Sequence, residues 1–169
     1  MVVAVSSMEI LNIQAEHYPK VARIYLQGIA TGKATFQTES PTWEYCDKNH
    51  LKHSRLAIFD GNEMAGWASL SPVSSRCVYE GVGEVSIYVA SNFRGKGIGK
   101  VLLQQLINES EENGLWTLQS GIFPENIGSI ELHKKCGFRV IGYRERVAQM
   151  NGVWKNNVIM ERRSVIVGI

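Results

Sequence analysis

The chain has 169 residues, of which 44% are apolar, 20% charged and 9% aromatic, and this composition excludes a disordered segment or a fibre. Its 18 lysines and arginines against 16 aspartates and glutamates leave a formal charge of +2, which argues against a general nucleic-acid-binding protein with a concentrated basic face. We expect one domain over residues 8–169. Because Met8 can serve as a start, residues 1–7 are expected to be a dispensable extension.

The three cysteines, Cys46, Cys77 and Cys136, are widely spaced and form no C-x-x-C pair. Their spacing relative to the four histidines matches no metal-binding pattern. An odd number of separated cysteines is typical of reduced thiols in a cytoplasmic protein. No stretch approaches the roughly 18 apolar residues of a membrane-spanning helix. We therefore expect a soluble cytoplasmic protein without a bound metal.

The first half of the chain predicts a strand, two helices and a β-hairpin. Apolar residues from Val21 to Ile29 recur at helical spacing. Pro41 and Thr42 are suited to begin the second helix, and Asp60-Gly61-Asn62 is typical of a hairpin turn. The predicted ranges are 8–13 for the strand, 21–29 and 41–52 for the helices, and 55–60 and 63–71 for the hairpin strands.

The second half predicts four strands and two helices. In the strand at 83–90, apolar side chains alternate with Glu84, Ser86 and Tyr88, so the two sets lie on opposite faces. Gly114 suits the position just after a helix. The remaining ranges are 96–113 and 126–136 for helices, and 115–122, 138–147 and 153–162 for strands. This order indicates an α/β (α+β) domain with a mixed sheet and about four helices.

A glycine-rich turn follows the strand that ends at Ala90 and opens the longest predicted helix. The first turn of a helix has backbone N–H groups without intrahelical partners, and the helix dipole favours negative charge there. Glycines let phosphate oxygens approach the backbone closely. Arg94, Lys96 and Lys100 add positive charge. The turn therefore predicts a phosphate-binding site.

The glycine spacing separates this turn from two common phosphate-binding motifs. The P-loop pattern G-x-x-x-x-G-K-S/T fails because Arg94 stands at its first glycine and Val101 follows Lys100. The dinucleotide pattern G-x-G-x-x-G fails because the glycines stand at 95, 97 and 99. The pattern that remains is R-x-x-G-x-G directly after a strand. A plain glycine turn with solvated lysines is the alternative.

This pattern and the order of elements resemble the GNAT superfamily of acyl-CoA N-acyltransferases over nearly the whole chain. The resemblance is stronger for the branch that acetylates phosphinothricin and methionine sulfoximine, and the segments that carry it are 34–39, 84–89, 126–133, 137–138 and 152–154. It implies the GNAT fold, in which a mixed, mostly antiparallel sheet is splayed at the CoA site and carries about four helices.

The resemblance also implies acetyl-CoA as co-substrate. In that family the splayed strand pairs with the pantetheine arm, the glycine turn holds the pyrophosphate, and the start of the next short helix contacts CoA. The residues implied to bind acetyl-CoA are Ile87, Tyr88, Val89, Arg94, Gly95, Lys96, Gly97, Ile98, Gly99, Lys100, Asn126 and Ser129.

Glu84 is the candidate general base. Acetyl transfer requires the removal of a proton from the acceptor ammonium, because a primary amine is mostly charged at pH 7. Glu84 matches the glutamate that has this role in the family, acting through a water. Backbone N–H groups near Val89 are expected to polarise the thioester carbonyl. An ordinary surface carboxylate is the alternative for Glu84.

His133 is the second catalytic candidate. On a helix, Asn126 and His133 are seven positions apart, which at about 100° per residue brings both to one side, with Ser129 between them. Many superfamily relatives have a tyrosine here as acid for the thiolate, whereas this branch has histidine. Its role stays open between leaving-group acid, amine base and substrate contact. No His–Asp pair is evident around Cys136, which argues against an acyl-cysteine intermediate. The resemblance implies direct transfer in a ternary complex.

The resemblance places the acceptor site on loops that contain Phe36, Arg76 and Tyr79. An arginine there can bind a substrate carboxylate or phosphinate through two hydrogen bonds. Trp154 reaches the site or a partner subunit, since branch members are homodimers with the acceptor site near the interface. The implied activity acetylates the primary amine of a small amino-acid-like substrate, such as phosphinothricin, methionine sulfoximine or methionine sulfone, in antibiotic or herbicide detoxification.

Other functions stay open. Where many relatives have an aspartate after the tryptophan, this chain has Asn156 or Asn157, which weakens the transfer of substrate identity. An enzyme that acetylates protein or peptide amines is one alternative. A non-catalytic acyl-CoA-binding regulatory module, which would not need Glu84, is another. A nucleotide-binding protein is a third.

Overall fold

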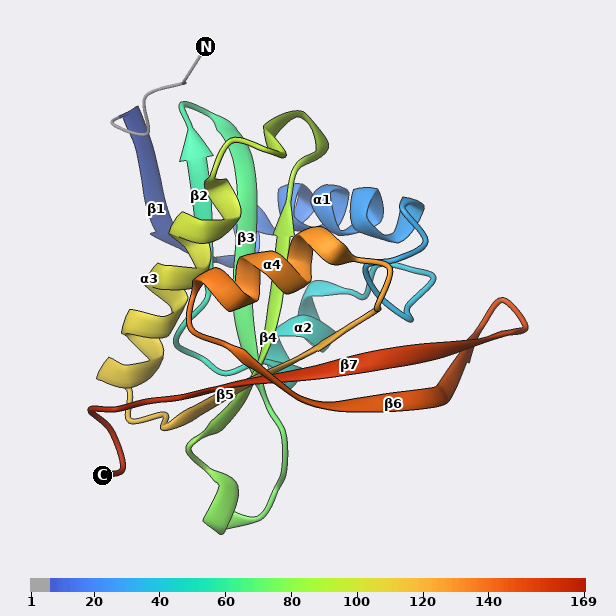
Figure 1. The fold of residues 1–169 in the computed structure, drawn as a ribbon. Helices are drawn as coiled ribbons and strands as arrows, with labels where there is room; N and C mark the ends of the chain where they lie inside the picture. The colour runs from blue at the N-terminus through green and yellow to red at the C-terminus, as the bar shows by residue number, and fades with distance from the viewer. Residues whose placement is uncertain (1–6) are drawn as a thin grey trace.

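The computed structural model describes residues 7–169, in which seven strands form one sheet in the order β1-β2-β3-β4-β5-β7-β6 (Figure 1). The strands are β1 Met8–Asn12, β2 Leu56–Asp60, β3 Glu63–Pro72, β4 Val82–Val89, β5 Thr117–Ile122, β6 Arg139–Met150 and β7 Val153–Arg163. The helices are α1 Tyr18–Ala30, α2 Trp43–Asn49, α3 Ile98–Glu112 and α4 Ile127–Lys135. The predicted N-terminal extension, apart from Ser7, lies outside the described residues.

Neighbouring strands pair antiparallel except for β4 and β5, which run parallel. The expected mixed, mostly antiparallel sheet with four helices is therefore confirmed for the described chain. Helices α1 and α2 cover one face of the sheet and α3 and α4 cover the other (Figure 1). Because β3 lies inside the sheet and is covered on both faces, its residues 64–70 are all buried.

Three helix ends follow from contacts or backbone conformations close in the chain. Thr42 caps α2 by accepting a hydrogen bond from the Tyr45 N–H at 3.2 Å. Gly97 precedes α3 in the left-handed region, with a φ of 82°. The prediction that α2 continues to about Lys52 is wrong, because the helix ends at Asn49 and His50 is already extended. The Arg55 side chain donates to the Asp47 carbonyl in the last turn of α2 and to the His50 and Leu51 carbonyls beyond it.

Strands β4 and β5 separate soon after they meet. Strand β4 pairs with β3 from Gly83 to Val89, but with β5 only over Val82–Glu84. Beyond Gln119, β5 keeps only its pairing with β7, which runs along its other edge from Thr117 to Ile122. Residues 85–89 of β4 thus have an edge without a strand partner among the described residues, close to the start of α3. The expected splay of the sheet is present at this point.

Strands β6 and β7 continue past the body of the sheet as a long two-stranded ribbon (Figure 1). Their register shifts between Arg144 and Ala148, where Arg146 has a φ of 46°. Elsewhere the main core lies between α3 and the sheet, where the α3 residues Ile98, Leu102 and Leu106 are almost completely buried. Across the described residues, no helix is both long and apolar enough to span a membrane.

Candidate active site

Two cavities lie at the splay between β4 and β5. The central cavity, of about 320 Å³, is lined by residues of α1, α2, the segment between them, β4, β5, α4 and β7. Because α1 and α2 lie on one face of the sheet and α4 on the other, this cavity extends through the gap between the strands. The turn cavity, of about 540 Å³, lies at the start of α3. Ala34, Tyr88, Asn126 and Ser129 line both cavities.

The structure brings most of the predicted site residues to these two cavities. Those lining the central cavity are Phe36, Glu84, Ile87, Tyr88, Asn126, Ser129 and His133. Those lining the turn cavity are Tyr88, Val89, Arg94, Gly95, Gly97, Ile98, Gly99, Lys100, Asn126 and Ser129. The two candidate catalytic side chains therefore share one cavity, although they come from β4 and α4.

The glycine turn has the conformation that its sequence requires. Gly95 and Gly97 have φ values of 76° and 82°, which side chains rarely tolerate. At Gly99, a Cβ atom would lie 3.0 Å from Leu132 Cδ2, so this glycine allows α4 to pack against α3. Lys96 differs from the prediction in one respect: its Nζ lies 5.3 Å from the centre of the Phe93 ring, and it does not line the turn cavity.

His133 is almost completely buried, with 1% of its surface exposed. Its Nδ1 lies 2.7 Å from the Ser129 carbonyl oxygen, and a carbonyl only accepts, so Nδ1 carries the hydrogen. Burial lowers the pKa of His133, although the Ser129 bond opposes this. The ring is therefore neutral, and Nε2 presents a lone pair. This buried Nε2 has no hydrogen-bond partner among the described residues.

Asn126 lies at the start of α4, where its side chain caps the helix. Its Oδ1 accepts a hydrogen bond from the Ser129 N–H at 3.3 Å. The same bond holds its side chain at the junction of the two cavities, which Asn126 and Ser129 both line. The expectation that Asn126, Ser129 and His133 lie on one side of this helix is confirmed.

Tyr88 is held by an aromatic cluster beneath α1. Its ring stacks on Trp67 with a centroid distance of 4.9 Å and meets Tyr25 edge-on at the same distance. A Cβ atom on Gly28 would lie 2.8 Å from the Tyr88 ring, so this glycine makes room for it. Burial, followed by the neighbouring Tyr25, raises the pKa of Tyr88. Tyr88 therefore stays protonated and forms a rigid wall shared by both cavities.

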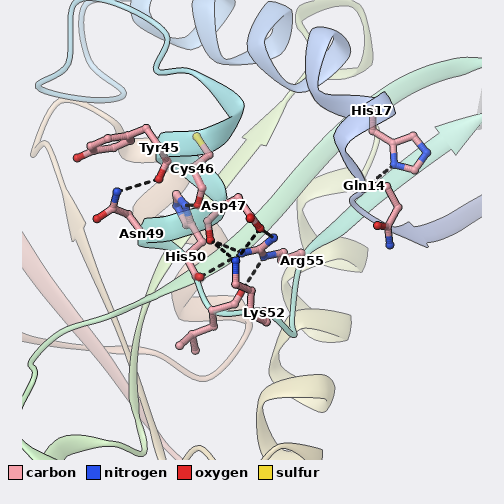
Figure 2. A network of polar contacts seen from close by, with 10 residues as sticks. Gln14, His17, Tyr45, Cys46, Asp47, Asn49, His50, Lys52 and Arg55 are labelled. Carbon is pink, nitrogen blue, oxygen red and sulfur yellow. Dashed lines mark hydrogen bonds and ion pairs between the residues drawn. The ribbon is translucent and has the colours of Figure 1, made fainter.

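One wall of the central cavity is α2, and a buried arginine anchors it. Arg55 donates hydrogen bonds to Asp47 Oδ1 at 2.6 Å, to the Asp47 carbonyl at 2.8 Å and to the His50 carbonyl at 3.1 Å (Figure 2). Lys52 and Arg55 together hold the pKa of Asp47 below its usual value. Because Tyr45, Cys46 and His50 line the cavity, this network sets the position of that wall.

The predicted substrate-binding residues divide into two groups. Phe36 packs edge-on against Phe123 at 4.6 Å and lines the central cavity. Arg76 and Tyr79 lie outside both cavities, with the guanidinium 5.5 Å from the Tyr79 ring centre. Trp154 is 55% exposed on the β6–β7 ribbon and also lines neither cavity.

Several lining residues were not predicted. Tyr25, Gln37 and Asn157 line the central cavity, and Lys33 lines the turn cavity. The helical periodicity around Tyr25 marks the inward side of α1, and this signal could have identified Tyr25. Gln37 lies in the segment 34–39 that carries the resemblance, and Asn157 is one of the two asparagines noted in the sequence. That they line the cavity, like the position of Lys33, depends on contacts between distant segments.

Comparisons with known proteins agree with this geometry. Residues 12–138 match the family model described as Acetyltransferase (GNAT) family. The L-methionine sulfoximine/L-methionine sulfone acetyltransferase of Pseudomonas aeruginosa is 35% identical over 99 residues, which cover 59% of this chain and 58% of that protein. The phosphinothricin N-acetyltransferase of Alcaligenes faecalis is 26% identical over 161 residues, which cover 89% of this chain and 79% of that protein.

A solved N-acetyltransferase structure has a similar fold. The crystal structure of ribosomal-protein-alanine N-acetyltransferase from Brucella melitensis is similar with a TM-score of 0.82 at 27% identity, over 92% of this chain and 99% of that one. The splayed sheet, the glycine turn at the start of α3 and the family match lead to one assignment. The chain belongs to the acetyltransferase (GNAT) family and is an N-acetyltransferase of the branch that includes the phosphinothricin and methionine sulfoximine acetyltransferases.

Proposed function

We propose that this enzyme transfers the acetyl group of acetyl-CoA to the primary amine of a small amino-acid-like substrate of the phosphinothricin, methionine sulfoximine or methionine sulfone type. The observation that carries the proposal is the meeting of two cavities, one at a helix N-terminus and one containing Glu84 and His133. One CoA molecule can then place its diphosphate at α3 and its thioester beside Glu84. The names of the two relatives support the substrate class.

Acetyl-CoA binding follows from the backbone around the splay. The N–H groups of the turn at 95–99 donate hydrogen bonds to the diphosphate, with Arg94, Lys100 and Lys33 as neighbouring cations. The unpaired edge of β4 at 87–89 pairs with the pantetheine arm. An N–H group near Val89 polarises the thioester carbonyl. Lys96, whose ammonium lies over Phe93, contributes to the surrounding potential without lining the cavity.

Direct transfer in a ternary complex is the proposed chemistry. Glu84 takes a proton from the ammonium through a water, and the amine nitrogen attacks the carbonyl carbon. The carbon–sulfur bond then breaks, and the released CoA thiolate takes up the second proton of the nitrogen to leave the neutral amide and CoA thiol. Burial raises the pKa of the Cys136 thiol, and Cys136 lines neither cavity, which supports direct transfer over an acyl-cysteine route. An ordinary thiol has a pKa of about 8.5, so the CoA thiolate is an adequate leaving group.

For His133, the structure favours the roles of amine base and substrate contact over that of leaving-group acid. A neutral ring with its hydrogen on Nδ1 has no proton to give from Nε2, so it does not begin the reaction as an acid for the thiolate. We propose that Nε2 accepts a hydrogen bond from the amine or from the water that relays its proton. His133 then assists Glu84 from the other side of the cavity.

The substrate carboxylate needs a cation, and the lining of the central cavity does not supply one. Glu84 is the only charged residue among its lining residues. We propose that Arg76, beside Tyr79 on the loop that precedes β4, binds the carboxylate, either in the same chain or across a dimer. The exposed apolar side chains Tyr143, Val147 and Trp154 on the β6–β7 ribbon support a homodimer. In a cell, the activity would detoxify amine-bearing inhibitors.

The test measures thiol release from acetyl-CoA with a panel of amines, headed by methionine sulfoximine, methionine sulfone and phosphinothricin. We expect saturable release with at least one of them, and a dimer by light scattering at the same concentration. Intact CoA binding without thiol release over the whole panel would reject the proposal. Because one similar structure is a ribosomal-protein-alanine N-acetyltransferase, peptides with N-terminal alanine belong in the panel. Faster acetylation of these peptides would favour a protein substrate.

A further inference from the structure

Two adjacent asparagines on β7 point to opposite faces of the sheet and differ in their contacts. Asn156 Oδ1 accepts a hydrogen bond from the Arg146 N–H at 2.8 Å, which stabilises the irregular part of the β6–β7 ribbon. Asn157 lies on the other face and lines the central cavity. Its Oδ1 is buried and has no hydrogen-bond donor among the described residues. A buried acceptor without a donor weakens a fold unless a ligand supplies one.

Gly121 of β5 leaves the space that the Asn157 amide occupies. A Cβ atom at position 121 would lie 3.1 Å from Asn157 Oδ1 and 3.3 Å from Nδ2. Gly121 does not have a positive φ, so the glycine is needed for space and not for its backbone conformation. A side chain here would force the amide to shift by at least a few tenths of an ångström from its position above the β5 backbone.

The strand register places Asn157 on the same face of the sheet as Glu84. Glu84 is opposite Gln119, and Gln119 is opposite Glu161, so these three share a face. Side chains alternate along each strand, and Gly121 and Asn157 therefore belong to that same face. This face is the one covered by α1 and α2, where Phe123 meets Phe36.

The charge of the cavity selects the kind of donor. Glu84 is the only charged residue in its lining, while burial lowers the pKa of both His50 and His133 toward the neutral form. The cavity is therefore negative, and it favours a cation that carries N–H groups. A primary ammonium meets both requirements, because it is attracted by Glu84 and can donate to a neutral amide oxygen.

We propose that Asn157 is a substrate-binding residue whose Oδ1 accepts a hydrogen bond from the acceptor amine and orients it beside Glu84. This inference rests on the proposed function for the identity of the amine. Gly121 acts as a positioning residue, since its lack of a side chain keeps the amide in the cavity.

Steady-state kinetics with methionine sulfone at saturating acetyl-CoA test the contact. Asn157→Leu should raise the KM for the amine roughly ten- to hundredfold, the cost of one lost hydrogen bond to a charged donor, and leave the KM for acetyl-CoA within about twofold of wild type. Asn157→Asp, which retains an acceptor oxygen, should bind the amine more tightly than Asn157→Leu. Gly121→Ala should raise the amine KM in the same way, and Asn156→Ala is the control that should not. An unchanged amine KM in Asn157→Leu would overturn the inference.

Two further measurements do not depend on turnover. Without ligands, Asn157→Leu should unfold at the same or a higher temperature than wild type, because it removes an unpaired buried oxygen. A clear fall in its melting temperature would show that the amide serves the fold, and would contradict the inference. Titration of methionine sulfone into the CoA-saturated protein should show weaker binding to the variant.

A wild-type enzyme that releases no thiol with any amine would refute the proposed function, but the titration would still decide the role of Asn157. Equal binding of methionine sulfone by wild type and variant, or no binding of any panel amine by wild type, would count against the proposed role of Asn157.

Discussion

The Nδ1 atom of His133 lies 2.7 Å from the carbonyl oxygen of Ser129, one helical turn earlier in α4. This contact determines which nitrogen of the ring carries the hydrogen and which is left as an acceptor. Because Nδ1 donates, Nε2 is an acceptor, and burial keeps the ring neutral by lowering its pKa. The helix thus fixes the position of an acceptor nitrogen on a residue that lines the same cavity as Glu84 of β4.

His133 should make the stability of the protein sensitive to acid. The unfolded chain protonates this histidine below its ordinary pKa of 6.5, whereas the folded protein resists protonation to a lower pH. The unfolded state then binds more protons, so the free energy of unfolding falls as the pH is lowered through 6.5. Urea unfolding at pH 7.5 and 5.5 should show a smaller loss for His133→Leu than for wild type. An equal loss would mean that His133 is protonated in the folded protein. The pKa values of His50 and His53 are also lowered by burial, so part of the acid sensitivity should remain.

Replacing Glu84 by glutamine should separate chemistry from co-substrate binding. Loss of a general base lowers kcat by roughly 10²- to 10⁴-fold, while CoA affinity, which depends on the turn at α3, should stay within about twofold. Stopped assays of thiol release and calorimetric titration with CoA measure the two quantities. Glu80→Gln, on the loop just before β4 and outside both cavities, is the matched control. A Glu84→Gln enzyme with wild-type kcat would exclude the general-base role.

Gly97 and Gly61 form a matched pair for testing the diphosphate site. Both have a positive φ, at 82° and 59°, and a Cβ atom on either would meet no neighbour within 4 Å. Substitution by alanine should therefore destabilise each protein by roughly 1–2 kcal/mol through backbone strain. Gly97→Ala should also weaken CoA binding, because it distorts the turn that presents the helix N–H groups. Gly61→Ala, in the β2–β3 hairpin, should leave CoA affinity unchanged, and equal loss of affinity in both variants would argue against the turn as the binding site.

Arg55 should influence the amine site through the position of α2. In Arg55→Met, the carbonyls of Asp47, His50 and Leu51 lose a donor, and we expect the free energy of unfolding to fall by about 2–4 kcal/mol. The amine KM should rise, because α2 walls the central cavity, and CoA affinity should not change. Lys52→Met is the control, since Lys52 is 70% exposed and pairs with Asp47 at the surface. Weakened CoA binding in Arg55→Met would indicate a disturbance beyond α2.

Local patterns in the sequence were enough to predict most elements and the co-substrate half of the site. The alternation in β4, the glycines at 95 and 97, and the seven-residue spacing from Asn126 to His133 each describe neighbours along one strand, turn or helix. Such features depend on backbone geometry, which nearby residues determine.

The half of the site that surrounds the acceptor amine was decided by tertiary structure. The end of α2 depends on Arg55, the Tyr88 wall on Trp67 and Gly28, and the cavity position of Asn157 on Gly121. Arg55 reaches back only five to eight residues to the end of α2, whereas the other two pairs come from segments far apart in the chain that strand register and packing bring together. The sequence by itself therefore determined where an anion meets the backbone, because that site lies within one turn. Only the tertiary structure decided which side chains surround the amine, because that cavity is built between elements.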